Sequence, residues 1–164
     1  MKKTVLIVGV AGRFGRQSAL AMRDAGWHVR GFARSAEKAS CIEGVEPCVG
    51  DIMDPVSLRK AAAGVDVIVQ AANPPYQLWN TQLVKINQAV IDVAVSVEAT
   101  VVVPKNVYIF GKKGGVWSED TPHVASHALA EIRMAMEAAY KKAAVDHDLP
   151  VLALRMGDFI DGPK

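Results

Sequence analysis

Short runs of apolar and β-branched residues alternate along this chain with longer, alanine-rich segments whose apolar positions recur at helical spacing. The apolar runs cover residues 4–8, 28–33, 46–50, 66–72, 100–104 and 150–155. The intervening segments cover residues 14–26, 35–40, 55–64, 78–97 and 125–147. Strands that alternate with helices predict parallel strands joined by crossover helices. We therefore expect an α/β fold in which residues 1–164 form a single domain, a doubly wound parallel sheet with helices on both faces.

The chain begins with two lysines and an apolar run, an order that also opens secretory leader peptides. Gly9 interrupts that run, and Arg13 and Arg16 follow it with no convincing cleavage site. We therefore interpret this segment as a buried first strand. Since no apolar stretch reaches the length of a membrane-spanning helix, we expect no membrane partner. The sparse cysteines suit a reducing cytosol, so we expect a cytoplasmic location.

The composition is that of an ordinary globular chain. Its 164 residues carry a formal net charge of +2, which gives no reason to expect nucleic acid as a partner. The two cysteines, Cys41 and Cys48, lack the number and spacing of a disulfide framework or a zinc site. We expect both to be lone buried thiols, and we expect no metal.

Three glycines spaced three apart, Gly9, Gly12 and Gly15, follow the first predicted strand and open the first predicted helix. In such a turn the glycines permit, in order, a tight bend, a close approach of backbone to a pyrophosphate, and close packing of the helix on the strand. The phosphates would lie at the amide-rich helix N-terminus. Although the spacing differs from the plainer G-x-G-x-x-G fingerprint, its position predicts dinucleotide binding rather than a purely structural turn.

The end of the second predicted strand bears on the choice of dinucleotide. An acidic residue there takes the ribose 2′-hydroxyl of NAD, whereas a 2′-phosphate calls for arginine. Here Arg34 follows the strand, Lys38 lies one helical turn further on, and no acid competes with them. Arg13 in the glycine loop adds a second guanidinium suited to phosphate oxygens. We predict NADP (NADPH) over NAD, while a solvated helix start is the other interpretation of Arg34 and Lys38.

Several segments resemble one family along nearly the whole chain. They are "GVAGRFG" (9–15), "GDIMD" (50–54), "QAAN" (70–73), "VKINQAVIDVA" (84–94), "NVYIFG" (106–111), "EDTP" (119–122) and "RMGDFIDGP" (155–163). Together they resemble the short-chain dehydrogenase/reductases, in particular the extended or atypical branch of NAD(P)-dependent epimerases and dehydratases. The stretch "AANPPY" (71–76) is similar to poorly characterised members of that branch. The resemblance implies a Rossmann-type fold and a nicotinamide dinucleotide.

The resemblance also implies which residues contact that cofactor. Asp51, with Ile52 beside it, would read the adenine, and Asn87 matches an asparagine on the fourth helix of the family. The loop residues expected at the phosphates are Gly9, Ala11, Gly12, Arg13, Phe14 and Gly15, and the turn under the adenine ribose is Ala71, Ala72 and Asn73.

The catalytic residues of the family do not recur in this sequence. Members that reduce or oxidise a carbonyl carry Ser or Thr after strand five and Tyr-x-x-x-Lys on the next helix, where the tyrosine exchanges a proton with the substrate oxygen. Counting back from Gly111 puts Asn106 at the Ser/Thr position. If Arg133 and Glu137 match the lysine and the acid that often follows it, Leu129 takes the tyrosine position. Leucine cannot transfer a proton, so we leave the catalytic residues unknown.

Both Leu129 and Arg133 have a structural interpretation beside the functional one. Leu129, Ile132 and Met136 share one helical face, so Leu129 is equally well explained as core packing. Arg133 either grips the cofactor ribose through its N–H groups or is an exposed helix arginine.

Tyr108 is the best remaining proton donor, because it lies two residues after Asn106 and would share a face with it on an extended strand. Four further side chains are weaker candidates, since such residues more often pack in the core or face solvent: Tyr76, Trp79, His123 and His127.

The end of the sequence and the missing tyrosine leave two functions open. In the extended branch the polypeptide continues past the Gly-Pro corner into a substrate domain, and we expect that domain to be lacking here. The apolar corner at Phe159 and Ile160 would then favour a homodimer. One function is an oxidoreductase or sugar-nucleotide epimerase relative of doubtful activity, acting on an unknown small-molecule substrate. The other is a non-catalytic NADP-binding redox sensor or scaffold.

Overall fold

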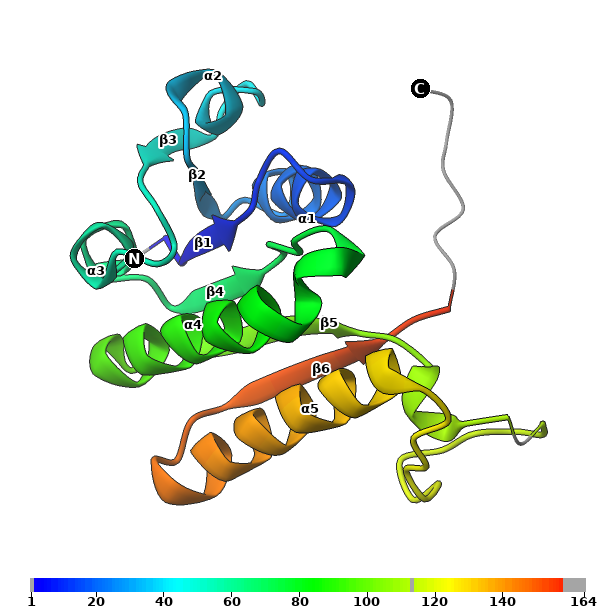
Figure 1. The fold of residues 1–164 in the computed structure, drawn as a ribbon. Coiled ribbons are helices and arrows are strands. Elements are labelled where there is room, and N and C mark those ends of the chain that lie inside the picture. The colour runs from blue at the N-terminus through cyan, green and yellow to red at the C-terminus, as the bar shows by residue number, and fades with distance from the viewer. Residues whose placement is uncertain (1, 113, 158–164) are drawn as a thin grey trace.

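The computed structural model describes residues 2–112 and 114–157, which form a parallel sheet covered by helices (Figure 1). The strands are β1 (Thr4–Val8), β2 (His28–Ala33), β3 (Glu46–Val49), β4 (Val67–Gln70), β5 (Thr100–Lys105) and β6 (Val151–Arg155). Their order is β3-β2-β1-β4-β5-β6, and every pairing is parallel. The order reverses between β1 and β4, which is where doubly wound folds bind ligands. The predicted fold class is confirmed.

Helices pack on both faces of this sheet because the strands alternate their side chains between the faces. On β1, Val5 and Ile7 join one buried cluster with Ala19 of α1. Leu6 and Val8 join the other cluster, which includes residues of α3, α4 and α5. The helices are α1 (Arg13–Asp24), α2 (Ala36–Ala39), α3 (Pro55–Ala62), α4 (Val84–Val97) and α5 (Ala128–Asp146).

Two predicted elements differ from the structure in a way that shapes the site. The strand predicted over 66–72 ends at Gln70, because the Gln70 amide group donates to the Ala72 carbonyl and accepts from the Ala72 N–H, which takes that backbone out of the ladder. The helix predicted over 78–97 begins irregularly, as a 3₁₀ turn η1 (Tyr76–Leu78) and a π turn η2 (Trp79–Leu83) before α4. The Trp79 Nε1 donates to the Pro74 carbonyl at 3.0 Å and fixes this entry.

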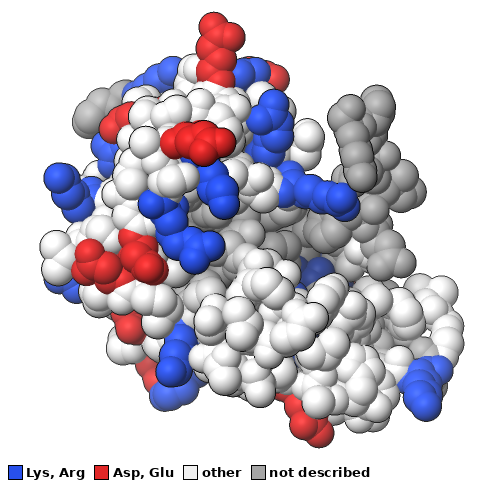
Figure 2. Space-filling model, turned by 45° about the horizontal axis from the view of Figure 1, so that its top comes forward, with Lys and Arg blue, Asp and Glu red and all other residues white. Residues whose placement is uncertain are grey.

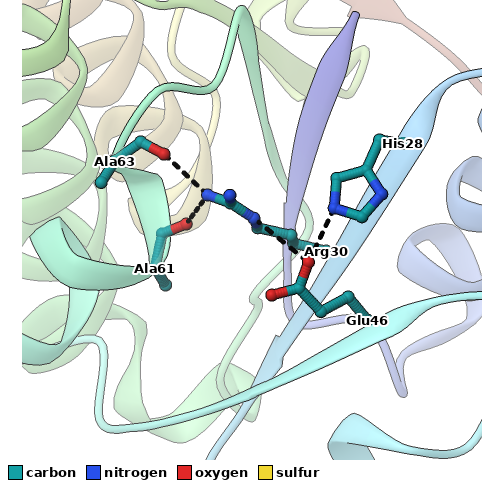
Figure 3. A network of polar contacts seen from close by, with 5 residues as sticks. All are labelled: His28, Arg30, Glu46, Ala61 and Ala63. Carbon is teal, nitrogen blue, oxygen red and sulfur yellow. Dashed lines mark hydrogen bonds and ion pairs between the residues drawn. The ribbon is translucent and has the colours of Figure 1, made fainter. Parts of the chain in front are cut away.

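A polar network joins the edge strand β3 to the rest of the sheet (Figure 3). The Glu46 carboxylate lies 2.7 Å from the His28 Nε2 and 3.5 Å from the Arg30 Nε. The Arg30 guanidinium also donates to the carbonyls of Ala61 and Ala63 at the end of α3. Because His28 and Arg30 lie in the amino-terminal half of β2, these contacts stabilise the end of the sheet opposite the glycine loop.

The remaining structural expectations have mixed outcomes. Cys48 is half-buried, and burial raises the pKa of its thiol, but Cys41 is exposed, so the prediction of a buried thiol is wrong there. Cys41 lies in the turn after α2, where no strand or helix covers it. Within the described residues no helix is long and apolar enough to cross a membrane, and no cluster of metal-ligating side chains occurs. Phe159 and Ile160 lie outside the described residues.

Candidate functional site

The glycine loop joins β1 to α1 at the switch point, where it touches the end of β4. Gly9 has a φ of +86°, a left-handed conformation that favours glycine. A Cβ on Gly9 would lie 2.8 Å from the backbone of Ala72. Gly9 therefore serves both the turn and a close approach between the ends of β1 and β4.

Gly12 and Gly15 occupy different surroundings. A Cβ on Gly15 would lie 2.3 Å from the Gly9 carbonyl oxygen, so α1 packs against the loop as closely as backbone allows. A Cβ on Gly12 would meet only that same oxygen, at 3.3 Å, and otherwise open space. The loop thus leaves room beside Gly12 for a ligand to approach the backbone.

The N-terminus of α1 favours an anion. No side chain caps this helix, and its first turn holds no acidic residue. Its partial positive charge therefore adds to the charge of Arg13, an exposed side chain in the first turn. Charged side chains gather over the half of the molecule that contains α1 and α2, and the surface is hollowed below that half (Figure 2).

The residues predicted to select the 2′-phosphate, Arg34 and Lys38, follow β2, and those predicted to read the adenine, Asp51 and Ile52, follow β3. Arg34 and Lys38 are exposed on either side of Ser35, whose hydroxyl caps α2 by accepting the Lys38 N–H at 3.4 Å. Asp51 is exposed and accepts the Met53 N–H at 2.8 Å, while Ile52 packs against the core. These four residues share an edge of the sheet with the glycine loop but do not line the cavity described next.

A cavity of about 130 Å³ opens beside the loop, between the ends of β4 and β5 and the helices α4 and α5. It brings together six of the residues predicted to contact the cofactor: Phe14, Ala71, Ala72, Asn73, Asn87 and Arg133. The other lining residues are Gln70, Leu83, Val103, Pro104, Lys105, Asn106, Met136, Met156 and Gly157. Asn106, at the position of the catalytic Ser or Thr, is therefore in the cavity.

Asn87 is fully engaged with its neighbours. It is 1% exposed, its Nδ2 donates to the Leu83 carbonyl at 2.8 Å, and its Oδ1 accepts the Tyr140 hydroxyl at 2.7 Å. Tyr140 is buried, and this burial raises the pKa of its hydroxyl. The pair joins α4 to α5 behind the cavity, and sequence reasoning missed it because the two residues are 53 positions apart.

Arg133 is not the exposed helix arginine of the alternative interpretation. Its guanidinium lies 4.0 Å from the centre of the Trp79 ring and donates to the Asn73 Oδ1 at 3.4 Å. Burial lowers its pKa, yet an arginine stays charged at any working pH. Arg133, which the resemblance matches to the family's lysine, is thus a permanently charged side chain at the cavity.

Leu129 packs with Ile132 against a small buried cluster that contains Trp79, Leu83 and Met136, so the shared helical face is confirmed. Tyr108 packs against the same cluster and does not line the cavity. The prediction that Tyr108 continues the strand beyond Asn106 is wrong. β5 ends at Lys105, and Tyr108 begins the 3₁₀ turn η3 (Tyr108–Phe110), where its N–H donates to the Asn106 Oδ1.

The weaker candidates have structural surroundings. Trp79 is buried, and the ring of the exposed Tyr76 lies 4.6 Å from its ring. His127 caps α5 through its Nδ1, which accepts the Ala130 N–H at 3.2 Å. His123 meets the edge of the Phe110 ring, and burial lowers its pKa.

Lys105 is a cavity residue that sequence reasoning missed. It ends β5, is 4% exposed, and its Nζ has no hydrogen-bond partner among the described residues. Burial lowers the pKa of this amine to about 8. The available signal was a lone lysine at the end of the apolar run "TVVVPK" (100–105), which predicts a charge carried into a sheet interior.

Residues 9–164 match a protein family described as NAD(P)H-binding. The chain belongs to this NAD(P)H-binding family. A curated relative, the photosystem II assembly factor Ycf39 of Cyanophora paradoxa, is 31% identical over 97 residues, which are 56% of this chain and 30% of that protein.

Solved structures share the fold of this NAD(P)H-binding chain. The UDP-glucose 4-epimerase of Brucella ovis in complex with NAD is 17% identical, with a TM-score of 0.81, over 93% of this chain and 51% of that one. The dTDP-glucose 4,6-dehydratase of Bacillus anthracis in complex with NAD is also 17% identical, with a TM-score of 0.80, over 93% and 54%. The chain thus spans about half the length of these proteins. The predicted nicotinamide-dinucleotide family is confirmed as the NAD(P)H-binding family, and the resemblance to the epimerases and dehydratases is confirmed in fold.

The glycine loop fits a dinucleotide on its own geometry. The open space beside Gly12, the helix N-terminus without an acidic residue and the approach of Gly9 to Ala72 are the features that a pyrophosphate requires. The cavity of about 130 Å³ is smaller than the ligand pockets of about 300–1,000 Å³ typical of proteins. It therefore matches one end of such a ligand or a separate small molecule, rather than a whole dinucleotide.

Proposed function

We propose that this chain binds NADP(H) in preference to NAD(H) across the switch point between β1 and β4, and that it is an oxidoreductase or epimerase relative with weak turnover. The observation that carries the proposal is the glycine loop, in which neighbouring backbone excludes a side chain at Gly9 and Gly15 while Gly12 faces open space that a phosphate could enter. A bound nicotinamide supplies or accepts a hydride, and the protein positions it.

The preference for NADP(H) is supported by the basic residues at the end of β2. Arg34 follows the strand directly and is exposed, and Lys38 is exposed one turn later. The one acid in the first turn of α2, Glu37, lies between them in sequence, so the position after the strand itself remains basic. An arginine there suits a 2′-phosphate through charge-assisted hydrogen bonds.

The weak turnover follows from the side chains at the cavity. A positioned acid contributes about 10²–10⁴-fold by giving a proton to a substrate oxygen. Leu129 has no proton to give, and Asn106 and Arg133 donate hydrogen bonds without titrating near neutral pH. The Lys105 amine, whose pKa burial lowers to about 8, has its Nζ buried away from solvent. We expect ordinary carbonyl and sugar-nucleotide substrates to turn over slowly or not at all.

A second candidate function is a non-catalytic NADP(H)-binding module. It is favoured by the packing of Leu129 against a hydrophobic cluster, where a catalytic tyrosine would need access to the ligand. One relative is named as a photosystem II assembly factor, and that name supports a non-catalytic role as the second candidate function of this chain. A self-associating, cytoplasmic chain without nucleic-acid partners remains our proposal for both functions.

The test is to titrate NADPH and NADH into the parent chain and into Arg34→Ala, following the fluorescence of the reduced nicotinamide. We expect NADPH to bind more tightly by at least about tenfold, the effect of one charge-assisted hydrogen bond of about 1.5–3 kcal/mol. Arg34→Ala should remove most of that preference without weakening NADH binding. The matched control is Arg59→Ala, an exposed arginine on α3. Equal affinities for the two cofactors in the parent chain would contradict the proposal.

A further inference from the structure

Arg133 is held at the cavity by groups other than an acid. Its guanidinium lies 4.0 Å from the centre of the Trp79 ring, and its Nη2 donates to the Asn73 Oδ1 at 3.4 Å. Within residues 2–112 and 114–157 no carboxylate forms an ion pair with it. Glu137, one turn further along α5, instead accepts two bonds from the Arg155 guanidinium. The Trp79 ring and the Asn73 amide therefore take the place of an ion-pair partner.

Trp79 is in turn fixed by its surroundings. It is 1% exposed, and its Nε1 donates to the Pro74 carbonyl at 3.0 Å. It packs with Leu83 and Met136 in a small buried cluster, and the Tyr76 ring lies 4.6 Å from its ring. Because the side chain has only two torsions and its N–H is engaged, the indole offers the guanidinium a rigid face.

A ring face restricts a guanidinium more than it restricts an ammonium. The guanidinium is planar, so it can stack on an indole and keep its N–H donors directed outward in one plane. A lysine, which the family resemblance would supply at position 133, carries a compact charge whose three donors rotate freely. The contact between Arg133 and Trp79 thus suits an arginine whose donors must keep a fixed direction.

We propose that Trp79 is a positioning residue for the bound dinucleotide, because its ring holds the Arg133 guanidinium where that group contacts the cofactor. Arg133 and Asn73 line the cavity beside the glycine loop, whereas Trp79 does not, so Trp79 acts through Arg133. This inference rests on the proposed function, because the cavity is where one end of the dinucleotide would bind. The role differs from proton transfer, since an indole N–H does not titrate.

The experiment is a double-mutant cycle on NADPH affinity, measured by the fluorescence of the reduced nicotinamide. It compares the parent chain, Trp79→Leu, Arg133→Met and the double variant. Arg133→Met should weaken NADPH binding at least about tenfold, the effect of one charge-assisted hydrogen bond. Trp79→Leu should weaken it about fivefold or more in the parent background. It should have no further effect in the Arg133→Met background, because its effect passes through the guanidinium.

Two further variants separate the ring face from a general loss of packing. Trp79→Phe keeps an aromatic ring with a weaker attraction for a cation, so its affinity for NADPH should lie between those of the parent and Trp79→Leu. Trp27→Phe is the matched control, because the Lys3 Nζ lies 5.6 Å from the centre of that ring and neither residue lines the cavity. It should leave NADPH affinity unchanged. Both Trp79 variants should weaken NADPH and NADH by the same factor, since the 2′-phosphate is assigned to Arg34.

Thermal unfolding checks that the variants are folded, and one measurement needs no variant. In the parent chain, the Arg133 side-chain protons over the indole should show an upfield ring-current shift by NMR. That shift should persist when NADPH binds, while the Arg133 Nε–H resonance moves. Loss of the ring-current shift in the NADPH complex would overturn the proposal, because the guanidinium would then have left the ring.

The outcomes separate this inference from the proposed function. Unchanged NADPH binding in Arg133→Met, or an equal loss from Trp79→Leu in both backgrounds, would overturn the positioning role while NADP(H) binding stands. Equal affinities for NADPH and NADH in the parent chain would contradict the proposed preference and leave the positioning role intact, since that role does not involve the 2′-phosphate. A parent chain that binds neither dinucleotide would overturn both.

Discussion

Lys105 should reduce the stability of the folded chain at neutral pH, so we predict that Lys105→Met is more stable than the parent. The side chain is 4% exposed, and the Nζ has no hydrogen-bond partner among the described residues. Methionine has a similar length, no charge, and adapts its shape to irregular surroundings. The substitution therefore removes the cost of burying an ammonium while filling most of the same space.

The size of the effect follows from the pKa. Burial lowers the pKa of Lys105 from its ordinary 10.5 to about 8. At about 1.4 kcal/mol for each unit of pKa, the protonated amine costs the fold about 3 kcal/mol. This cost already contains the attraction of Glu137 and the repulsion of the neighbouring cations.

The pH dependence gives the prediction its sign. Below about pH 8 both the folded and the unfolded chain hold the proton, so the full cost is present. Between about 8 and 10.5 the folded chain releases the proton first, and the stability of the parent rises relative to the variant. The advantage of Lys105→Met should thus be about 3 kcal/mol near pH 7 and shrink by about 2 kcal/mol near pH 9.5.

The assay is urea unfolding followed by circular dichroism at those two pH values, for the parent, Lys105→Met and Lys85→Met. Taking the difference between parent and variant cancels the titration of all other groups. Lys85→Met, at an exposed position on α4, should leave stability nearly unchanged. A Lys105→Met chain that is less stable than the parent at neutral pH, or a difference independent of pH, would refute the reasoning.

Three further substitutions test the glycine loop and the position assigned to the missing tyrosine. Gly12→Val should abolish NADPH binding with little loss of stability, because its Cβ meets only one backbone oxygen, at 3.3 Å. Normal NADPH binding by this variant would place the phosphates elsewhere. Gly15→Val should instead unfold the loop, since its Cβ would lie 2.3 Å from the Gly9 carbonyl oxygen. Leu129→Tyr should raise NADPH oxidation with small aldehydes and ketones by about 10²–10⁴-fold if the alignment of that position is right, measured by the loss of nicotinamide absorbance with Tyr108→Phe as control. Robust turnover in the parent chain that survives Tyr108→Phe would contradict the assigned weak activity.

The sequence by itself determined the class of fold and the position of the dinucleotide loop. Alternating apolar runs and helical segments are local patterns, so the residues of a strand such as β1 are enough to predict that its side chains are buried. The glycine loop can also be recognised from the sequence, because Gly9 adopts a φ of +86° and a Cβ on Gly15 would meet the carbonyl of Gly9, only six residues earlier. The contact of Gly9 with Ala72 is visible only in the tertiary structure. Counting along the chain predicts that Asn106 and Leu129 stand where the family's catalytic residues would fall, and that alignment stays a prediction.

Only the tertiary structure decided which side chains face one another across the cavity. The cavity joins residues from β4, β5, α4 and α5, and no periodicity in the sequence relates Asn73 to Arg133 or Asn87 to Tyr140. The end of β5 at Lys105 likewise turned Tyr108 away from the cavity and left the lysine inside it. The cost of a buried charge depends on the groups around it in space, and these are set by the packing of α5 against β5 and β6 rather than by the residues beside Lys105 in the chain.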